Sequence, residues 1–209
     1  MLEIICVTYG QNECLKCLIN SFKSQTSNNW FLRIIHDGQG EEYEALKKDL
    51  KDNDYLSDQV LIEAVPERMN NYGHSSRDFG LQNPVRDSDW ILLTNGDNYY
   101  LPTFVEAMEE IIEAEEEVGF IFCNYIQKLD HKIHPVKRDK FFPMDNEIRE
   151  GWIDMGSAIV ITDVARKVGF KNLTAYNGDY LYFKDCIEAL NNPSDNAIIK
   201  TSEYLYVHT

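Results

Sequence analysis

Long apolar runs alternate with amphipathic segments along the first half of the chain. The runs are nearly continuous, as is typical of strands buried on both faces of a sheet, and they cover residues 2–9, 30–38, 59–67 and 90–95. Between them, apolar residues at helical spacing predict helices over about 13–24, 41–51 and 75–83. This alternation predicts an α/β fold with a mostly parallel sheet flanked by helices.

The second half has a less regular pattern. Pro102 precedes Thr103-Phe-Val-Glu106, a sequence typical of the capping box that opens a helix. Further strands are expected at 118–126, 156–162 and 198–208, and helices at 163–168 and 179–190. The 209 residues fit one domain, with a regular half over 1–102 and a less regular half over 103–209 that includes a smaller, irregular portion.

Charge and hydropathy exclude several classes of protein. The formal net charge of −15 argues against nucleic acid as the main partner, because phosphate binding needs a basic surface. Much of the excess is interpreted as the solvated face of one helix, formed by Glu109, Glu110, Glu113, Glu115, Glu116 and Glu117. No apolar stretch approaches the roughly 20 residues that span a bilayer, and no signal-type segment opens the chain. We therefore expect a cytoplasmic protein without an integral membrane segment.

Five cysteines, an odd number, argue against a disulfide framework. Cys14 and Cys17 have the spacing of a redox or zinc motif, but they lie within a predicted helix. We interpret them as packing residues of that helix, with redox or zinc chemistry as the alternative.

Polar residues follow three of the predicted strands at their carboxyl ends. The first strand ends in Thr8-Tyr9, the second in His36-Asp37-Gly38 and the fourth in Asn95-Gly96-Asp97. A turn is the simplest interpretation of each segment alone. Ligands of open parallel sheets bind beyond the carboxyl ends of the strands, so a shared ligand explains the segments better together.

Four segments in order along residues 2–102 resemble one known family. They are IICVTYGQNECLKCLINSFKSQT, IIHDG, NYGHSSRDFGL and WILLTNGDNYYLP. They are similar to the Pro-Thr-Tyr-Asn, Asp-Asp-Gly-Ser, Asn-x-Gly…Arg-Asn-x-Gly and Asp-x-Asp segments of family 2 type glycosyltransferases. The sequence thus resembles these enzymes, which have the GT-A fold, a Rossmann-like sheet that binds a nucleotide sugar.

The resemblance implies a UDP-sugar donor bound by the first half of the chain. Thr8, Tyr9 and Asp37 would hold uracil and ribose, because a carboxylate accepts hydrogen bonds from base and ribose donors. A strand-ending turn is the alternative for Asp37. Asn95 and Gly96 would contact the donor sugar nucleotide as part of the Asp-x-Asp block, with Asn95 bonding hydroxyls through its amide.

Arg77 and Gly73 belong to the third segment. By the resemblance, Arg77 would face the nucleotide and bind phosphate or an orienting carboxylate, and Gly73 would let backbone approach closely. The alternative for Arg77 is a surface salt bridge with Asp78 or Asp87.

The resemblance also implies a divalent cation, Mn²⁺ or Mg²⁺. Asp97 matches the last Asp of Asp-x-Asp, which binds the cation in the family, whereas Asn95 replaces the first Asp and adds no charge. His208 matches a His that many GT-A enzymes place against the metal, and an imidazole ligand would favour Mn²⁺. A frayed terminus is the alternative for His208.

The acceptor half of the site is implied for residues 103–209. Asp179 matches the acid that takes the proton of the acceptor hydroxyl in inverting members, with a helix N-cap as the alternative. Gly178 stands where the family usually has a further acid. Trp152 would stack on a sugar and Asp154 would bond its hydroxyls, with core packing as the alternative for Trp152.

A basic patch precedes these residues and consists of His131, Lys132, His134, Lys137, Arg138 and Lys140. It is either a lid over the donor diphosphate or a solvated hairpin.

Taken together, the resemblance implies a hexosyltransferase that is metal-dependent and moves a sugar from a UDP-sugar to an acceptor hydroxyl with inversion. The acceptor is a glycan, lipid or protein hydroxyl. One alternative is a catalytically inactive nucleotide-sugar-binding protein, which the departures at Asn95 and Gly178 favour. The other is a sugar-phosphate nucleotidyltransferase, whose Gly-rich basic loop is absent from TYGQNECLKC after the first strand.

Overall fold

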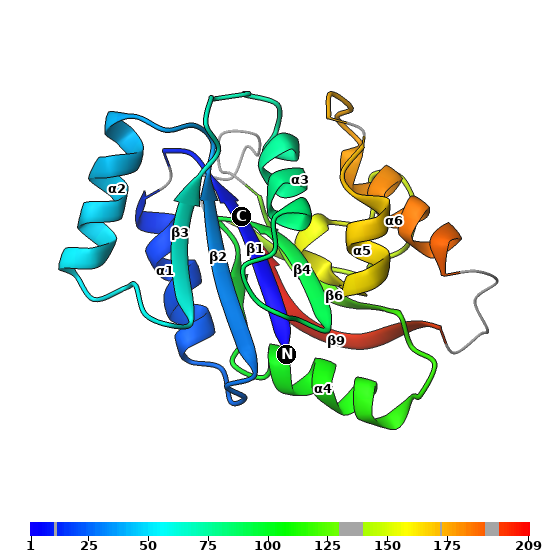
Figure 1. The fold of residues 1–209 in the computed structure, drawn as a ribbon. Coiled ribbons are helices and arrows are strands. Elements are labelled where there is room, and N and C mark those ends of the chain that lie inside the picture. Colours follow the sequence, from blue (N-terminus) through cyan, green and yellow to red (C-terminus); the bar gives the residue numbers. More distant parts are fainter. Residues whose placement is uncertain (11, 130–139, 172, 191–196) are drawn as a thin grey trace.

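A central mixed sheet with helices on both faces forms the core of the protein (Figure 1). The computed structural model describes residues 1–10, 12–129, 140–171, 173–190 and 197–209. The α/β class is confirmed. The expected strands and helices occur with bounds shifted by a few residues, because the ends of elements depend on local contacts that periodicity does not report.

Strands and helices alternate along much of the described chain. The strands are β1 (Leu2–Thr8), β2 (Trp30–His36), β3 (Val60–Ala64), β4 (Trp90–Asn95), β5 (Tyr99–Tyr100), β6 (Phe120–Leu129), β7 (Lys140–Met144), β8 (Ala158–Ile161) and β9 (Ile198–His208). The helices are α1 (Asn12–Lys23), α2 (Glu41–Asp52), α3 (His74–Gln82), α4 (Phe104–Ala114), α5 (Thr162–Val168) and α6 (Gly178–Ala189), with a 3₁₀ turn η1 (Met155–Ser157) before β8.

The sheet is mixed rather than purely parallel. Its strand order is β3-β2-β1-β4-β8-β6-β9-β5, with β7 paired to β6. β1, β2, β3 and β4 run parallel, and so do β6 and β9, but β8 is antiparallel to both β4 and β6. A continuous apolar run marks a strand buried on both faces without giving its direction, so the sequence pattern could not predict this insertion.

Alternate residues of β1 face two separate apolar layers. Ile4 and Cys6 pack in a cluster with α1, α2 and α4, whereas Ile5 packs in a second cluster with α3, α5 and α6. The two sets of helices therefore cover opposite faces of the sheet (Figure 1). Burial on both faces explains why all seven residues of β1 are buried.

The start of α4 is capped by side chains from the segment after α1. Thr103 makes no side-chain capping bond, so the predicted capping box is wrong. Instead, Gln25 Oε1 accepts the N–H of Val105 at 3.0 Å, and Glu106 accepts the hydroxyl of Thr26 at 2.8 Å. The Gln25 contact satisfies a free helical N–H from outside the helix, and both contacts join residues 80 positions apart.

The packing interpretation of Cys14 and Cys17 is also wrong. Both side chains are exposed, and the buried stripe of α1 runs through Leu15, Leu18, Ile19, Ser21 and Phe22. All five cysteines are free thiols. Among the described helices, none combines the length and apolar character needed to cross a membrane.

Buried charges join the strands on the face covered by α3 and α5. The Arg33 guanidinium on β2 and the Glu3 carboxylate on β1 are both excluded from solvent, and Nη1 lies 2.8 Å from Oε1. Arg33 also donates to the carbonyl of Gly80 in α3, and Arg166 of α5 pairs with Glu3 at 2.9 Å. Such a network specifies one arrangement of the layers, because each charge left without its partner would be costly.

We expect Glu3→Ala to lower the free energy of unfolding by about 3 kcal/mol, because it removes the fully buried carboxylate of Arg33 and leaves only that of Glu63, which is 34% exposed. Urea unfolding at pH 7 measures the change. The control is Lys48→Ala, which removes an exposed ion pair with Asp52 and should leave the urea midpoint unchanged. A Glu3→Ala protein as stable as the Lys48→Ala protein would show that the network does not hold the layers.

Candidate functional site

A cleft of about 350 Å³ opens where the strand order reverses between β1 and β4. Ligands of open α/β sheets bind in the crevice beyond the carboxyl ends of the strands at such a point. Its lining residues come from the ends of β1, β2 and β4 and from the segment before α3: Val7, Thr8, Tyr9, Asp37, Arg68, Asn70, Tyr72, Gly73, Asn95 and Asp97. Six residues predicted from the sequence, namely Thr8, Tyr9, Asp37, Gly73, Asn95 and Asp97, therefore lie around one cleft.

Backbone geometry at the carboxyl ends of β1 and β4 brings these side chains together. The N–H of Gly96 donates to the carbonyl of Val7 at 3.0 Å, so Gly96 passes directly beside Thr8. Within the described chain, the buried Thr8 hydroxyl has no hydrogen-bond partner. Gly73 has a left-handed φ of 77°, and a Cβ there would lie 2.7 Å from a Val7 methyl, so only glycine fits at this wall.

Asp37 holds the segment that forms the outer wall of the cleft. One carboxylate oxygen accepts the N–H of Met69 and the other accepts the N–H of Asn70, both at 3.0 Å. Each oxygen retains a further lone pair for a ligand. Arg68, which the sequence did not single out, lies with its guanidinium 3.5 Å from the ring centre of Tyr9 and donates to the Tyr9 hydroxyl.

Arg77 of α3 is buried and binds the end of β4. Its Nη2 donates to Asn95 Oδ1 at 2.5 Å, and its Nη1 donates to the carbonyl of Tyr72 at 2.7 Å. The alternative of a surface salt bridge is wrong, because Arg77 is 2% exposed and Asp78 instead accepts the N–H of Phe170. Burial lowers the pKa of the Arg77 guanidinium, and the nearby carboxylates of Asp179, Asp154 and Asp97 oppose this shift. The guanidinium still stays charged, because its ordinary pKa lies far above neutrality.

His74 connects Arg77 to the segment before α6, and sequence reasoning missed it. Nδ1 lies 3.1 Å from Arg77 Nη1, which can only donate, so Nδ1 accepts and Nε2 carries the proton. Nε2 therefore donates to the carbonyl of Ala175 at 3.0 Å. Burial lowers the pKa of His74, which keeps the ring neutral in this role. The only signal in the sequence was its position three residues before Arg77, next to the start of the helix predicted over about 75–83.

Gly178 is closed to any side chain by the His74 ring. A Cβ at Gly178 would lie 2.8 Å from His74 Nε2 and 3.2 Å from the Phe170 ring, against which His74 stacks. The missing acid at this position therefore has a steric cause.

Asp179 lies in the first turn of α6, and the N-cap position belongs to Asn177. The alternative that Asp179 is the N-cap is thus wrong. Burial raises the pKa of Asp179 to about 6, and the charge of Asp154 adds to the shift. The Arg77 charge, the N–H of Met155 and His208 act in the opposite direction. A carboxyl group with this pKa is ionised at neutral pH and can take up a proton.

Asp154 and His208 form a pair across the 3₁₀ turn and β9. Asp154 Oδ1 accepts the N–H of Gly156 at 2.8 Å and the hydroxyl of Tyr206, while Oδ2 lies 3.3 Å from His208 Nδ1. The hydroxyl of Thr209 donates to the carbonyl of Asp97, so the end of β9 lies beside the turn after β4. His208 is held by β9 and Asp154, which contradicts the alternative of a frayed terminus.

The donor set fits a cation only in part. No group of three or more His, Cys, Asp and Glu side chains in the described chain is arranged to hold a metal. Asp97 at the cleft and His208 beside its turn supply a carboxylate and an imidazole, and Asp154 orients the imidazole as carboxylates do for metal-bound histidines. Two such ligands suit a cation that arrives with a diphosphate, whose oxygens and water complete the shell.

Trp152 lies away from the core. Its side chain is 38% exposed, and the Arg149 guanidinium covers its ring at 3.7 Å from the centre. The core-packing alternative is therefore wrong. The basic patch expected as a lid or hairpin lies outside the described residues except for Lys140, the first residue of β7.

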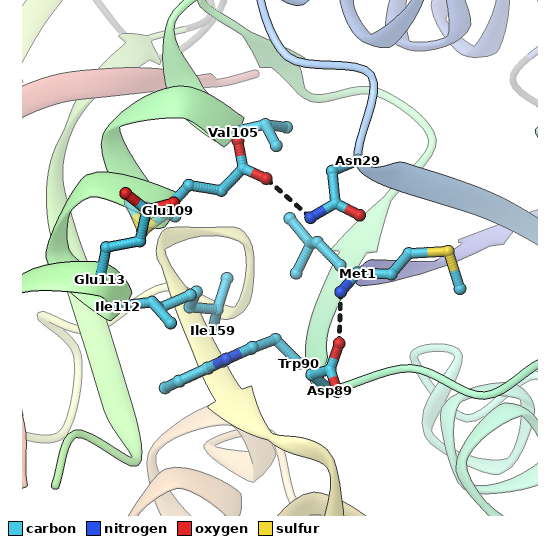
Figure 2. A pocket seen from close by; sticks show the side chains of 11 residues that line it. Met1, Asn29, Asp89, Trp90, Val105, Glu109, Ile112, Glu113 and Ile159 are labelled. Carbon is cyan, nitrogen blue, oxygen red and sulfur yellow. Dashed lines mark hydrogen bonds and ion pairs between the residues drawn. The ribbon is translucent and has the colours of Figure 1, made fainter. Parts of the chain in front are cut away.

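A second cavity of about 180 Å³ lies near the amino ends of β1 and β4, away from the cleft (Figure 2). It is lined mainly by apolar residues such as Val105, Met108 and Ile112 of α4. Asn29 bonds Glu109 across it, and the amino group of Met1 pairs with Asp89. None of the residues predicted to carry chemistry lines it, so the cleft at the carboxyl ends is the candidate site.

No protein-family model and no curated protein matches this sequence. Solved structures do. TarS 1–349 of S. aureus superposes with a TM-score of 0.72 at 15% identity, covering 100% of this chain and 60% of that one. The same protein in complex with UDP-GlcNAc gives 0.73 at 13% identity, covering 99% and 58%. The chain has the GT-A glycosyltransferase fold.

A third similar structure is the mannosyltransferase PcManGT from Pyrobaculum calidifontis in complex with GDP-Man and Mn²⁺. It superposes with a TM-score of 0.65 at 10% identity, covering 99% of this chain and 56% of that one. The chain spans roughly three fifths of the length of these structures. The GT-A fold expected from the four sequence segments is confirmed, whereas membership of family 2 stays a prediction.

In metal-free buffer at pH 8, we expect Asp179→Asn to raise the free energy of unfolding by on the order of 1–3 kcal/mol. The folded protein binds this proton more tightly than the unfolded chain, so wild-type stability falls as pH rises from about 4 to 6. The difference in the free energy of unfolding between Asp179→Asn and wild type should therefore shrink as the pH is lowered from about 6 to 4. Thermal unfolding of both proteins at pH 8 and pH 4.5 measures it, with the exposed Asp58→Asn as control. A gain that is equal at both pH values would contradict a raised pKa at Asp179.

Proposed function

We propose that this protein is a glycosyltransferase that moves a sugar from a UDP-sugar to an acceptor hydroxyl with inversion, aided by Mn²⁺ or Mg²⁺. The observation that carries the proposal is the arrangement around Arg77. This buried cation bonds Asn95 at the cleft and lies close enough to Asp179 to shift its pKa. A nucleotide cleft and a carboxyl group with a pKa of about 6 are thereby joined by one side chain.

The donor would lie along the carboxyl ends of β1 and β4. Tyr9 and Asp37 suit a base and ribose, and the unpaired Thr8 hydroxyl offers a further hydrogen bond. The likeness to TarS structures with UDP and UDP-GlcNAc supports a nucleotide sugar as donor. PcManGT was solved in complex with GDP-Man, so GDP-sugars are the natural comparison in an assay.

In the proposed reaction the acceptor oxygen attacks the anomeric carbon, and the bond from that carbon to the diphosphate oxygen breaks. Asp179 takes the proton of the acceptor hydroxyl, and UDP leaves with the bonding electron pair. Arg77 stabilises the ionised form of Asp179 before the transfer. Attack from the face opposite the diphosphate inverts the configuration.

Asp97 and His208 would hold the cation, and Asp154 would orient His208. A bound divalent cation would neutralise charge on the leaving diphosphate. Trp152 would stack on a sugar ring, and Asp154 would bond its hydroxyls. The cytoplasmic location and the division of the chain into a donor half over 1–102 and an acceptor half over 103–209 stay predictions.

A catalytically inactive nucleotide-sugar-binding protein remains the second candidate, because Asn95 lacks the charge of the family's first Asp. Asn95 nevertheless takes part in the site, since its side-chain oxygen accepts a hydrogen bond from Arg77. A nucleotidyltransferase has less support, because no Gly-rich basic loop follows β1 in the sequence.

We expect Asp179→Asn to bind UDP within threefold of wild type and to lose turnover by about a hundredfold or more, because it lacks only the base. We expect Asp97→Asn to lose the Mn²⁺-dependent part of UDP binding. Calorimetry with UDP measures binding. Turnover is measured by release of UDP from UDP-glucose, UDP-galactose and UDP-GlcNAc, and of GDP from GDP-mannose, with and without Mn²⁺.

Asp58→Asn, an exposed acid away from the cleft, is the matched control and should behave as wild type. Full turnover in both test variants would refute the assignment. UDP binding by the wild type without any sugar release would favour the inactive binding protein.

A further inference from the structure

Two tyrosines stand together at the rim of the cleft with most of their surface in solvent. Tyr72 is 65% exposed and Tyr176 is 89% exposed. Their ring centres are 6.0 Å apart and the rings meet edge to face at 83°. An aromatic pair in this geometry is favourable in itself, yet it leaves ring surface free for a ligand.

The backbone at Tyr72 is held in a conformation that a bulky residue rarely adopts. Its φ is 59°, in the left-handed region, and its carbonyl accepts from the buried Arg77 at 2.7 Å. A non-glycine residue there is strained, and the strain persists because Arg77 fixes the peptide. Strained residues concentrate at ligand sites, and this one directs an aromatic side chain outward beside the cleft.

The tyrosines connect the donor cleft with the candidate base. Tyr72 lines the cleft, whereas Tyr176 comes three residues before Asp179 in the segment that enters α6. His74 ties the two segments together, since it contacts Arg77 on one side and the carbonyl of Ala175 on the other. An acceptor whose hydroxyl reaches Asp179 would therefore pass this pair.

Polar groups flank the tyrosines on the α6 side. Asn177 donates to the carboxylate of Glu150 at 3.0 Å, which joins this segment to the one that carries Trp152. Trp152 is itself partly exposed under the Arg149 guanidinium. Aromatic faces interleaved with amide and carboxylate groups match a sugar ring, which has apolar C–H faces and hydroxyls at its edge.

We propose that Tyr72 and Tyr176 form a stacking wall for the sugar ring of a carbohydrate acceptor. This inference rests on the proposed function, and it names the class of acceptor. A lipid chain or an apolar peptide would need a contiguous apolar patch, whereas these two rings carry hydroxyls and have Asn177 and Glu150 beside them. A carbohydrate needs only isolated ring faces with hydrogen-bonding groups around them.

The probes are cellohexaose, chitohexaose and maltohexaose. Their binding to the full chain saturated with UDP and Mg²⁺ is measured by saturation-transfer NMR. Transfer is measured separately, without added UDP, by the increase in UDP release from the active UDP-sugar. We expect at least one hexaose to bind the wild type and to bind Tyr176→Ala about three- to tenfold more weakly, the factor expected for one aromatic contact.

Tyr176→Phe keeps the ring and should bind the hexaose within twofold of wild type. The control is Tyr204→Ala, which removes a tyrosine of β9 that is 38% exposed and does not line the cleft. UDP binding by Tyr176→Ala should match wild type, since Tyr176 does not line the cleft.

The inference is overturned if no hexaose binds the wild type, or if Tyr176→Ala binds as well as wild type does. It is also overturned if Tyr176→Ala loses binding to phosphatidylcholine vesicles and not to a hexaose. A different result would refute the proposed function, namely a wild-type protein that does not bind UDP. If such a protein still bound a hexaose through Tyr176, the carbohydrate site would stand although no nucleotide-sugar donor is bound.

Discussion

The whole site depends on one buried guanidinium. Arg77 cannot lose its proton, so its burial requires partners, and it finds them in the carbonyl of Tyr72, in His74 and in Asn95. These contacts fix the start of α3 against the end of β4. They also place a permanent positive charge near Asp179, where burial alone would push the carboxyl further toward its neutral form. The neutral Asn95 suits this setting, because its oxygen accepts from Arg77 without adding a charge to a region already rich in carboxylates.

Stability and chemistry are divided between the two ends of the strands. Glu3 lies near the amino end of β1 and is neutralised by Arg33 and Arg166. At the carboxyl ends, by contrast, Asp179 carries a charge that burial opposes. The ion pairs of Glu3 stabilise the sheet near its amino ends. This stability can offset the free-energy cost of the buried Asp179 carboxylate at the carboxyl ends, as is common where function opposes stability.

Much of this fold could be predicted from local pattern. Continuous apolar runs gave β1, β2, β3 and β4, and polar residues after them identified the edge where Thr8 and Asp97 lie. Contacts between distant segments were beyond such reasoning. The antiparallel insertion of β8, the cap that Gln25 gives to α4, and the bonds of His74 to Arg77 and Ala175 each join residues whose pairing no periodicity encodes. Site roles inferred from the family resemblance remain untested at Asp97, Asp179 and His208, because the positions of these side chains do not report what they bind.

The close approach of His74 to Gly178 has an evolutionary consequence. A lineage that acquired an acid at position 178 would first have to shorten the side chain at 74, and that loss would release both Arg77 and the carbonyl of Ala175. The two positions are therefore coupled in one direction: a side chain at position 178 fits only where residue 74 is smaller than histidine, and that smaller residue gives up the contacts that hold Arg77.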